Sequence, residues 1–306
     1  MDMTQNKCCR HGANLRRRRR RRRKILRSII FSCSIIAVAV FVAVGSSMIR
    51  SGDGGTNRYD VEAGNNTYDN AVIENSKISE KNKIQNNQSM LDDIMNSTQY
   101  PKQLKDLALK NEEALEFVYD YPAEHVKEHT IDLTEEASMD SVPLFVQWDK
   151  RWGYEKYSGN FFAASGCGPT TLSMVVVYLT HNREASPIAV AKYSKEAGYS
   201  VDGSGSSWTL ISEGCMHYGV KAKAVALDES RMKAELDEGH PIVVNVGPGD
   251  FTDTGHFMVI TGYDDVSGDF IFGDVLTGTK NRRFSYSNFQ SSYNILGRQS
   301  VVIYKK

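Results

Sequence analysis

The chain has 306 residues, with 37 basic and 37 acidic side chains and five cysteines, a length that can hold one or two domains. Residues 1–27 contain twelve Lys and Arg against the single acid Asp2, so the remainder carries 25 basic and 36 acidic residues. That acidic body argues against nucleic acid as a partner. Only Cys167 and Cys215 fall in the globular part, which argues against a disulfide framework. We also expect no metal or cofactor, because the sequence contains no metal-ligand spacing and no phosphate-binding loop.

The N-terminal region has the pattern of a membrane anchor. Eight consecutive arginines, 16–23, precede 22 uncharged and mostly apolar residues, 28–49, a length that crosses a bilayer as a helix. Since a basic flank stays on the inner side, we predict a basic cytoplasmic segment at 1–27, a single-pass signal anchor at 28–49 and an extracytoplasmic body. Small residues at 43–45 resemble a cleavage site, so secretion after signal cleavage remains the alternative.

Residues 50–140 fall into two parts that differ in their content of apolar residues. Residues 50–98 are polar and poor in large apolar side chains, which predicts a disordered linker or stalk. Apolar residues then recur at helical spacing and stop before Tyr121-Pro122. We therefore predict a helical lead segment at 99–140, packed on the globular body, with residues 123–140 as its charged surface connection.

The body, expected at 141–306, begins with an extended run and continues with helices and then strands. The first predicted helix starts at Cys167, and three more follow at 187–197, 208–218 and 232–238. The predicted strands are 242–246, 256–263, 269–272 and 301–304. Residues 203–207, rich in Gly and Ser, are predicted to be a mobile loop. Helices first and strands afterwards favour an α+β fold over alternating βαβ units.

The first candidate catalytic residue is Cys167, which lies in the stretch Gly166-Cys167-Gly168-Pro169-Thr170 at the start of an apolar helix. A helix N-terminus favours the thiolate, which is the nucleophile that acyl transfer needs, and the flanking glycines leave room beside it. The alternatives are a buried structural thiol or a disulfide with Cys215, which would remove the nucleophile.

Two further residues complete a candidate triad. His256 begins the predicted strand 256–263, and Asp274 follows the next strand, eighteen residues later. In an antiparallel pair those two strand ends can lie side by side. An imidazole beside a thiol forms the thiolate–imidazolium pair, and a carboxylate beside the imidazole fixes its tautomer.

The body resembles the bacteriocin-processing (double-glycine) peptidase-like group of papain-like cysteine peptidases, over roughly half of the chain. The resemblance is carried by Val142-Pro143-Leu144 with Gln147, by the Cys167 stretch, by Gly255-His256-Phe257 with Gly262-Tyr263, and by Gly273-Asp274. It implies a papain-like fold with the cysteine helix packed against an antiparallel sheet. It also implies that Cys167 is the nucleophile, His256 the general base and acid, and Asp274 the group that orients the imidazole.

The resemblance also implies an oxyanion-stabilising glutamine ahead of the cysteine. In the transporter-fused members this glutamine stands six residues before the cysteine, where this chain has Phe161. Gln147 is the only glutamine between the start of the body and Cys167, and we nominate it instead. The alternative is that Gln147 is an ordinary polar residue of an edge strand.

Together these features predict a membrane-anchored cysteine peptidase that acts on a peptide or protein substrate outside the cytoplasm. The P-loop motif of an ATP-binding domain is absent, so we do not expect transport-coupled leader removal. Two alternatives stay open: a transpeptidase or amidase that uses the same acyl-enzyme on cell-wall peptides, and a catalytically silent binding module.

Overall fold

The computed structural model describes residues 66–248, 251–278, 282–287 and 300–305. The chain divides into two compact units, 1–69 and 70–306, and nearly all described residues belong to the second. The predicted basic segment at 1–27 and the predicted anchor at 28–49 lie outside the described residues. Within the described part, no helix is both long enough and apolar enough to cross a membrane.

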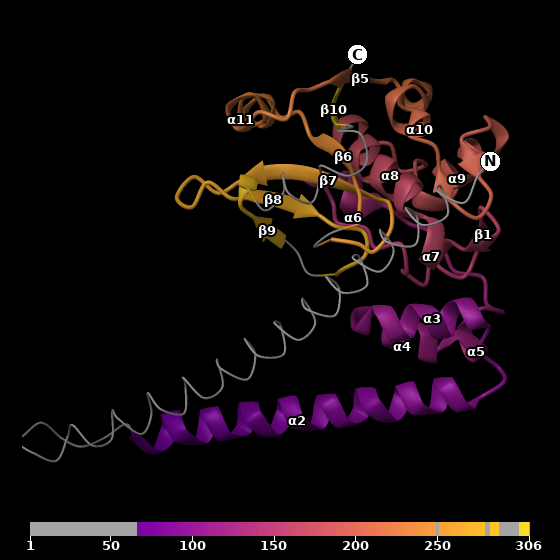
Figure 1. Ribbon diagram of the computed structural model, residues 1–306, viewed down its shortest axis with the longest axis vertical. Helices are drawn as coiled ribbons and strands as arrows, with labels where there is room; N and C mark the ends of the chain where they lie inside the picture. Colours follow the sequence, from indigo (N-terminus) through magenta and orange to yellow (C-terminus); the bar gives the residue numbers. More distant parts are fainter. Residues whose placement is uncertain (1–65, 249–250, 279–281, 288–299, 306) are drawn as a thin grey trace, which may run out of the picture. The chain divides into compact units, whose positions relative to one another are not determined.

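The elements follow one another as in Figure 1. The helices are α2 (Asn66–Asn96), α3 (Lys102–Lys110), η2 (Glu112–Ala114), α4 (Leu115–Tyr119), α5 (Tyr121–Glu124), α6 (Thr134–Ala137), α7 (Phe162–Ser165), α8 (Cys167–Thr180), α9 (Pro187–Glu196), α10 (Thr209–Ser212), η3 (Gly214–Tyr218) and α11 (Glu229–Asp237). The strands are β1 (Lys156–Tyr157), β2 (Asn160–Phe161), β3 (Ser200–Val201), β4 (Gly205–Ser206), β5 (Val220–Ala224), β6 (Ile242–Val246), β7 (His256–Tyr263), β8 (Phe270–Gly273), β9 (Arg282–Phe284) and β10 (Ser300–Lys305).

A six-stranded antiparallel sheet in the order β5-β10-β6-β7-β8-β9 forms the centre of the body. Its two faces are buried by different helices. Val243 pairs with Val259 and faces the core that includes α8, whereas the neighbouring pair Ile242 and Ile260 faces the core that includes α11. Because both faces are covered, β6 and β7 are almost continuously apolar, and their bounds coincide with the predicted strands.

The helix α8 packs directly on the sheet, as the resemblance implies, and Figure 1 shows it beside β6 and β7. Every residue from Gly168 to Val177 is buried, because α8 is enclosed between the sheet, α9 and the short helices around it. A helix that is apolar on all sides is stable only in such a fully enclosed position. The fold is therefore α+β, with the helix that begins at Cys167 in its core.

Three predictions about the body need correction. Strands β5 and β9 were not predicted, and they form the two edges of the sheet. The predicted helix 208–218 is divided into α10 and η3. The predicted mobile loop at 203–207 contains β4, which pairs with β3, and the Ser206 hydroxyl bonds the buried Tyr157 hydroxyl at 2.6 Å.

The predicted disordered linker is also wrong over residues 66–96, which form α2. Hydrophobicity alone misses this helix because its sequence is mostly polar, but the segment contains neither Gly nor Pro, the two residues that interrupt helices most strongly. Near its end Ile94 is fully buried in a cluster with residues of α3 and α4. The packing of that last part compensates for the weak apolar pattern of the rest.

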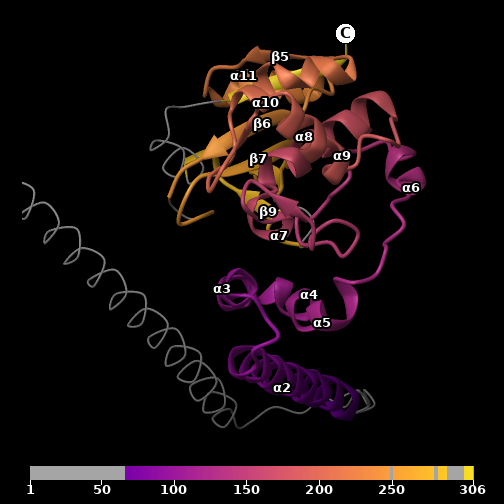
Figure 2. The ribbon, with the colours of Figure 1, turned by 90° about the vertical axis from the view of Figure 1, so that its right-hand side faces the viewer.

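The lead segment is helical but does not form one continuous helix. It is interrupted at Asn111, whose extended backbone ends α3 and whose side chain accepts the Glu113 N–H at the start of η2. The segment packs on the body through the stacked rings of Phe117 and Tyr154, 4.2 Å apart between centroids, and through the Lys150–Asp120 ion pair at 2.6 Å. Figure 2 shows α3, α4 and α5 together below α7.

Candidate active site

Cys167 is the first residue of α8, with Gly166 as the N-cap residue and Pro169 in the first turn. The thiol is half-buried and free. Position 168 requires a glycine because Ser206 lies close to its backbone: a Cβ there would lie 2.5 Å from the Ser206 hydroxyl oxygen. The β3–β4 hairpin thus packs against the start of α8.

His256 and Asp274 lie as the strand argument predicts. His256 is the first residue of β7, and Asp274 directly follows β8, which pairs with β7. The His256 Nε2 and the Asp274 Oδ1 are 2.8 Å apart, and both side chains are buried. Because Nε2 is bound to Asp274 and His256 also interacts with the Cys167 thiol, Nδ1 is the ring nitrogen left to face the sulfur.

The electrostatics of this trio favour an ion pair. Burial is the largest influence on the Cys167 thiol and raises its pKa, but the hydrogen bond and charge of His256 and the N–H groups of Phe257 and Gly168 outweigh it and lower the pKa. Burial is also the largest influence on His256 and lowers its pKa, but Asp274 and Cys167 outweigh it and raise the pKa. A thiol with a lowered pKa beside an imidazole with a raised pKa shares its proton with the ring.

Gln147 is buried and lines the same pocket as Cys167. Its Nε2 donates one hydrogen bond to the Ala163 carbonyl at 2.6 Å and makes no other among the described residues, where its Oε1 also lacks a partner. Its backbone N–H bonds the Val275 carbonyl, next to Asp274, at 2.9 Å. The side chain therefore retains one N–H that no described residue accepts, in the same pocket lining as Cys167.

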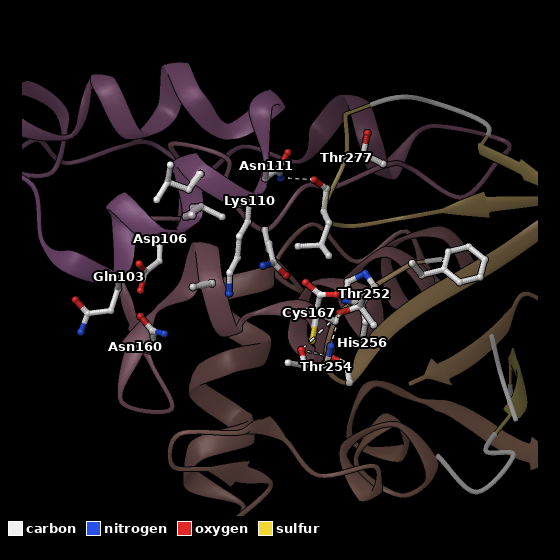
Figure 3. Close-up of a pocket in the computed structure, with 18 of the residues that line it drawn as sticks. Gln103, Asp106, Lys110, Asn111, Asn160, Cys167, Thr252, Thr254, His256 and Thr277 are labelled. Atoms are coloured by element: carbon white, nitrogen blue, oxygen red, sulfur yellow. Dashed lines mark hydrogen bonds between the residues drawn. The ribbon is translucent and has the colours of Figure 1, made fainter. Parts of the chain in front are cut away.

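A pocket of about 910 Å³ contains the thiol and the imidazole. One wall comes from the lead segment, where Gln103, Asp106 and Lys110 of α3 lie across the pocket from Cys167 and His256 (Figure 3). The opposite wall includes residues 251–255, which lead into β7. The residues of α3 were not among the predicted site residues, because nothing local in their amphipathic pattern indicates a cleft.

Other candidate features have structural roles. Cys215 is buried and free, and burial raises the pKa of its thiol to about 11. The disulfide considered between Cys167 and Cys215 is thus not formed. The aromatic residues Trp148, Trp152, Tyr154 and Trp208 belong to the hydrophobic clusters or pack against them, and none is among the described residues that line the pocket.

Comparison with known proteins assigns the body to a family. No curated protein matches the chain. Several solved structures are similar to part of the chain. One, from Bacillus anthracis, is described as a C39-like peptidase and is 14% identical, with a TM-score of 0.39, over 55% of this chain and 96% of that chain.

Another is the peptidase domain of Streptococcus ComA, a bi-functional ABC transporter involved in quorum sensing. It is 21% identical, with a TM-score of 0.37, over 46% of this chain and 93% of that chain. At such low scores neither likeness adds to the assignment, which rests on the family model. Residues 139–301, just over half of the chain, match the model of the Peptidase_C39 like family, and the chain therefore belongs to this family of cysteine peptidases.

Proposed function

We propose that the protein hydrolyses peptide bonds through a triad of Cys167, His256 and Asp274. The observation that carries the proposal is the series of a half-buried thiol, an imidazole that interacts with it, and a buried carboxylate hydrogen-bonded to that imidazole. It lies in a pocket large enough for several side chains of a peptide. Each group in the series has the neighbour that its role requires.

The reaction follows from this arrangement. The Cys167 thiolate attacks the carbonyl carbon of the scissile amide, and the His256 imidazolium gives its proton to the departing amine, which leaves a thioester. His256, now neutral, takes a proton from water as the water attacks the thioester, and the thiol is released with the carboxylic acid product. Asp274 holds the Nε2–H of His256 throughout, so that Nδ1 faces the sulfur.

The negative charge on the carbonyl oxygen needs donors during both steps. We assign this role to the backbone N–H of Cys167 and to the second side-chain N–H of Gln147. Gln147 is held in place by its bond to the Ala163 carbonyl and lies in the pocket lining with Cys167. Donors fixed in advance act in the transition state without the cost of reorganisation.

The test is a proteome-wide cleavage screen with the full-length wild type, Cys167→Ala and His256→Ala. We expect new peptide termini with the wild type only, and labelling by a thiol-directed peptide electrophile that Cys167→Ala removes. Undiminished labelling of Cys167→Ala would overturn the assignment of the nucleophile. Adding an acceptor amine in the same assay distinguishes hydrolysis, which yields a free carboxylate, from transfer to the amine.

The membrane anchor belongs to the same proposal. The uncharged residues 28–49 after the arginine-rich segment support a signal anchor that leaves the peptidase domain outside the cytoplasm. Protease added to intact cells, prepared so that it reaches the outer face of the cytoplasmic membrane, should digest a tag placed after Lys306. Protection of that tag until the cells are lysed would refute the orientation, and its recovery from the medium would instead support cleavage near residues 43–45.

A further inference from the structure

The site contains a segment that the family model does not include. The match begins at residue 139, whereas α3 and the start of η2, residues 102–113, contribute one wall of the pocket. Figure 3 shows Asn111 at the end of this segment, directed toward the loop that carries Thr277. That loop follows Asp274, so the lead segment contacts the part of the body that presents the acidic member of the triad.

The Asp274 turn, residues 274–278, is held by its own backbone, by Gln147 and Trp148 of the body, and by the lead segment. The Asp274 Oδ1 accepts the Leu276 N–H at 3.0 Å in addition to the His256 Nε2. The Leu276 carbonyl accepts the Asn111 Nδ2 at 2.6 Å and the Trp148 Nε1 at 3.1 Å. Asn111 therefore holds the same residue whose N–H positions the catalytic carboxylate.

Glu113 holds the far end of the same turn. Its carboxylate accepts the Thr277 hydroxyl and, at 2.7 Å, the Gly278 N–H. The Asn111 Oδ1 accepts the Glu113 N–H at 3.1 Å, so the two lead-segment residues are also linked to each other. Hydrogen bonds to an ionised carboxylate are stronger than those between neutral groups, and two of them fix the direction of the turn.

From these contacts we infer that Asn111 and Glu113 are positioning residues, which act through the Asp274 turn to hold His256 in its catalytic orientation. The lead segment is then part of the functional site as well as a tether. This inference rests on the proposed triad. Without the two side chains, the turn keeps its internal bonds and its bonds to Trp148 and Gln147. It loses the bonds that Asn111 and Glu113 make at Leu276, Thr277 and Gly278, and the carboxylate can then shift relative to the imidazole.

A pH readout separates positioning from mere stabilisation. Among the described residues, the charged groups that line the pocket are Asp106, Lys110, Glu113 and Asp253, but Asp274 and Cys167 are the groups that raise the pKa of His256. If Asp274 is displaced, the pKa of His256 falls and the Cys167 thiolate loses its partner. The thiol then needs a higher pH to ionise, and the imidazolium deprotonates at a lower pH.

The experiment measures the rate of iodoacetamide alkylation of Cys167 against pH in the full chain, together with peptide turnover. We test Asn111→Ala, Glu113→Ala and Glu113→Gln, with Glu116→Ala as an exposed control on α4. We expect Glu113→Ala to shift the alkylation profile to higher pH and to lower turnover about tenfold, the lower end of the range for removing a partner that orients a metal-ligating imidazole. Glu113→Gln, which keeps one acceptor oxygen, should be intermediate, and Glu116→Ala should behave as wild type.

The alkylation profile tests the inference even if no peptide substrate is turned over, so its failure is distinct from failure of the proposed function. An unchanged profile in folded Asn111→Ala and Glu113→Ala overturns the inference. A loss of turnover without a shift of the profile also overturns it, since it assigns the segment to substrate binding. Thermal unfolding of each variant shows whether it is folded, and if Glu113→Ala is not, Glu113→Gln decides the outcome by the same criterion.

Discussion

Cys167 and Cys215 occupy similar positions in the chain but have opposite chemical character. Each lies in the first turn of a helical segment, α8 or η3, and each contacts the same hydrophobic core. Burial raises the pKa of the Cys215 thiol to about 11, whereas the pKa of the Cys167 thiol is lowered despite burial.

The difference shows that a helix start does not by itself make a reactive thiol. Burial opposes ionisation at both positions. What Cys167 has in addition is an imidazole from β7, N–H groups from Phe257 and Gly168, and access to the pocket. The chain thus contains its own unreactive reference thiol, against which each of the following variants can be measured.

The largest expected effect comes from removing one thiol or the other. Cys167→Ala should abolish turnover, a loss of about 10⁶-fold when a nucleophile that acts with a base is removed. Cys215→Ala should retain turnover and lower the free energy of unfolding by about 1 kcal/mol, because it only leaves a small space in the core. Turnover and denaturant unfolding of both variants check this pair, and loss of turnover in folded Cys215→Ala would contradict it.

Removing the imidazole should make Cys167 resemble Cys215. In His256→Ala the hydrogen bond and charge that lower the thiol pKa are absent, so the pKa rises and alkylation near neutral pH becomes slow. Turnover should fall nearly as far as in Cys167→Ala, because a nucleophile and its base act as a unit. Alkylation rates across the pH range give the thiol pKa directly. A profile identical to wild type would mean that the helix start alone activates the sulfur.

Gln147→Ala should separate thiol activation from transition-state stabilisation. Losing one oxyanion donor typically costs about 10²–10³-fold in kcat, while the thiolate–imidazolium pair remains. We therefore expect low turnover with an unchanged alkylation profile of Cys167. Gln147→Glu, which keeps the size but not the donor, serves as the matched variant, and normal turnover in either would exclude Gln147 from the oxyanion site.

Asp274→Asn should have the smallest effect, about 10–100-fold, by analogy with the partners that orient metal-ligating imidazoles. The carboxylate raises the pKa of His256, so its neutralisation lowers that pKa. The imidazolium then loses its proton at a lower pH, and the alkaline limb of the kcat/KM profile moves toward neutral. A limb that stays in place would show that Asp274 does not act on the imidazole.

The sequence predicted the parts of the fold that are buried on both faces. The bounds of β6 and β7 follow from two nearly continuous apolar runs, which are separated by a segment rich in Gly, Asp and Thr. The missed strands β5 and β9 are the edges of the sheet. Their sequences are VKAKA and RRF, and they carry the charges that protect a sheet edge from further pairing. Strands with such charges are missed when strands are predicted from apolar residues.

The candidate residues Cys167, His256 and Asp274 were predicted from the sequence because each belongs to a local signal: a helix start or a strand end. Their mutual contact required the pairing of β7 with β8 and the packing of α8 on β7. The roles of Asn111 and Glu113 could not be predicted, because their partners lie about 165 residues further along the chain.

The sequence by itself thus determined where several helices start and strands end, and which residues stand at those positions. It could do so because caps, turns and apolar periodicity act over only a few residues. Only the tertiary structure decided that the lead segment forms a wall of the pocket and that β10 inserts between β5 and β6. The physical reason is that these contacts depend on packing between segments far apart in sequence, to which no local preference contributes.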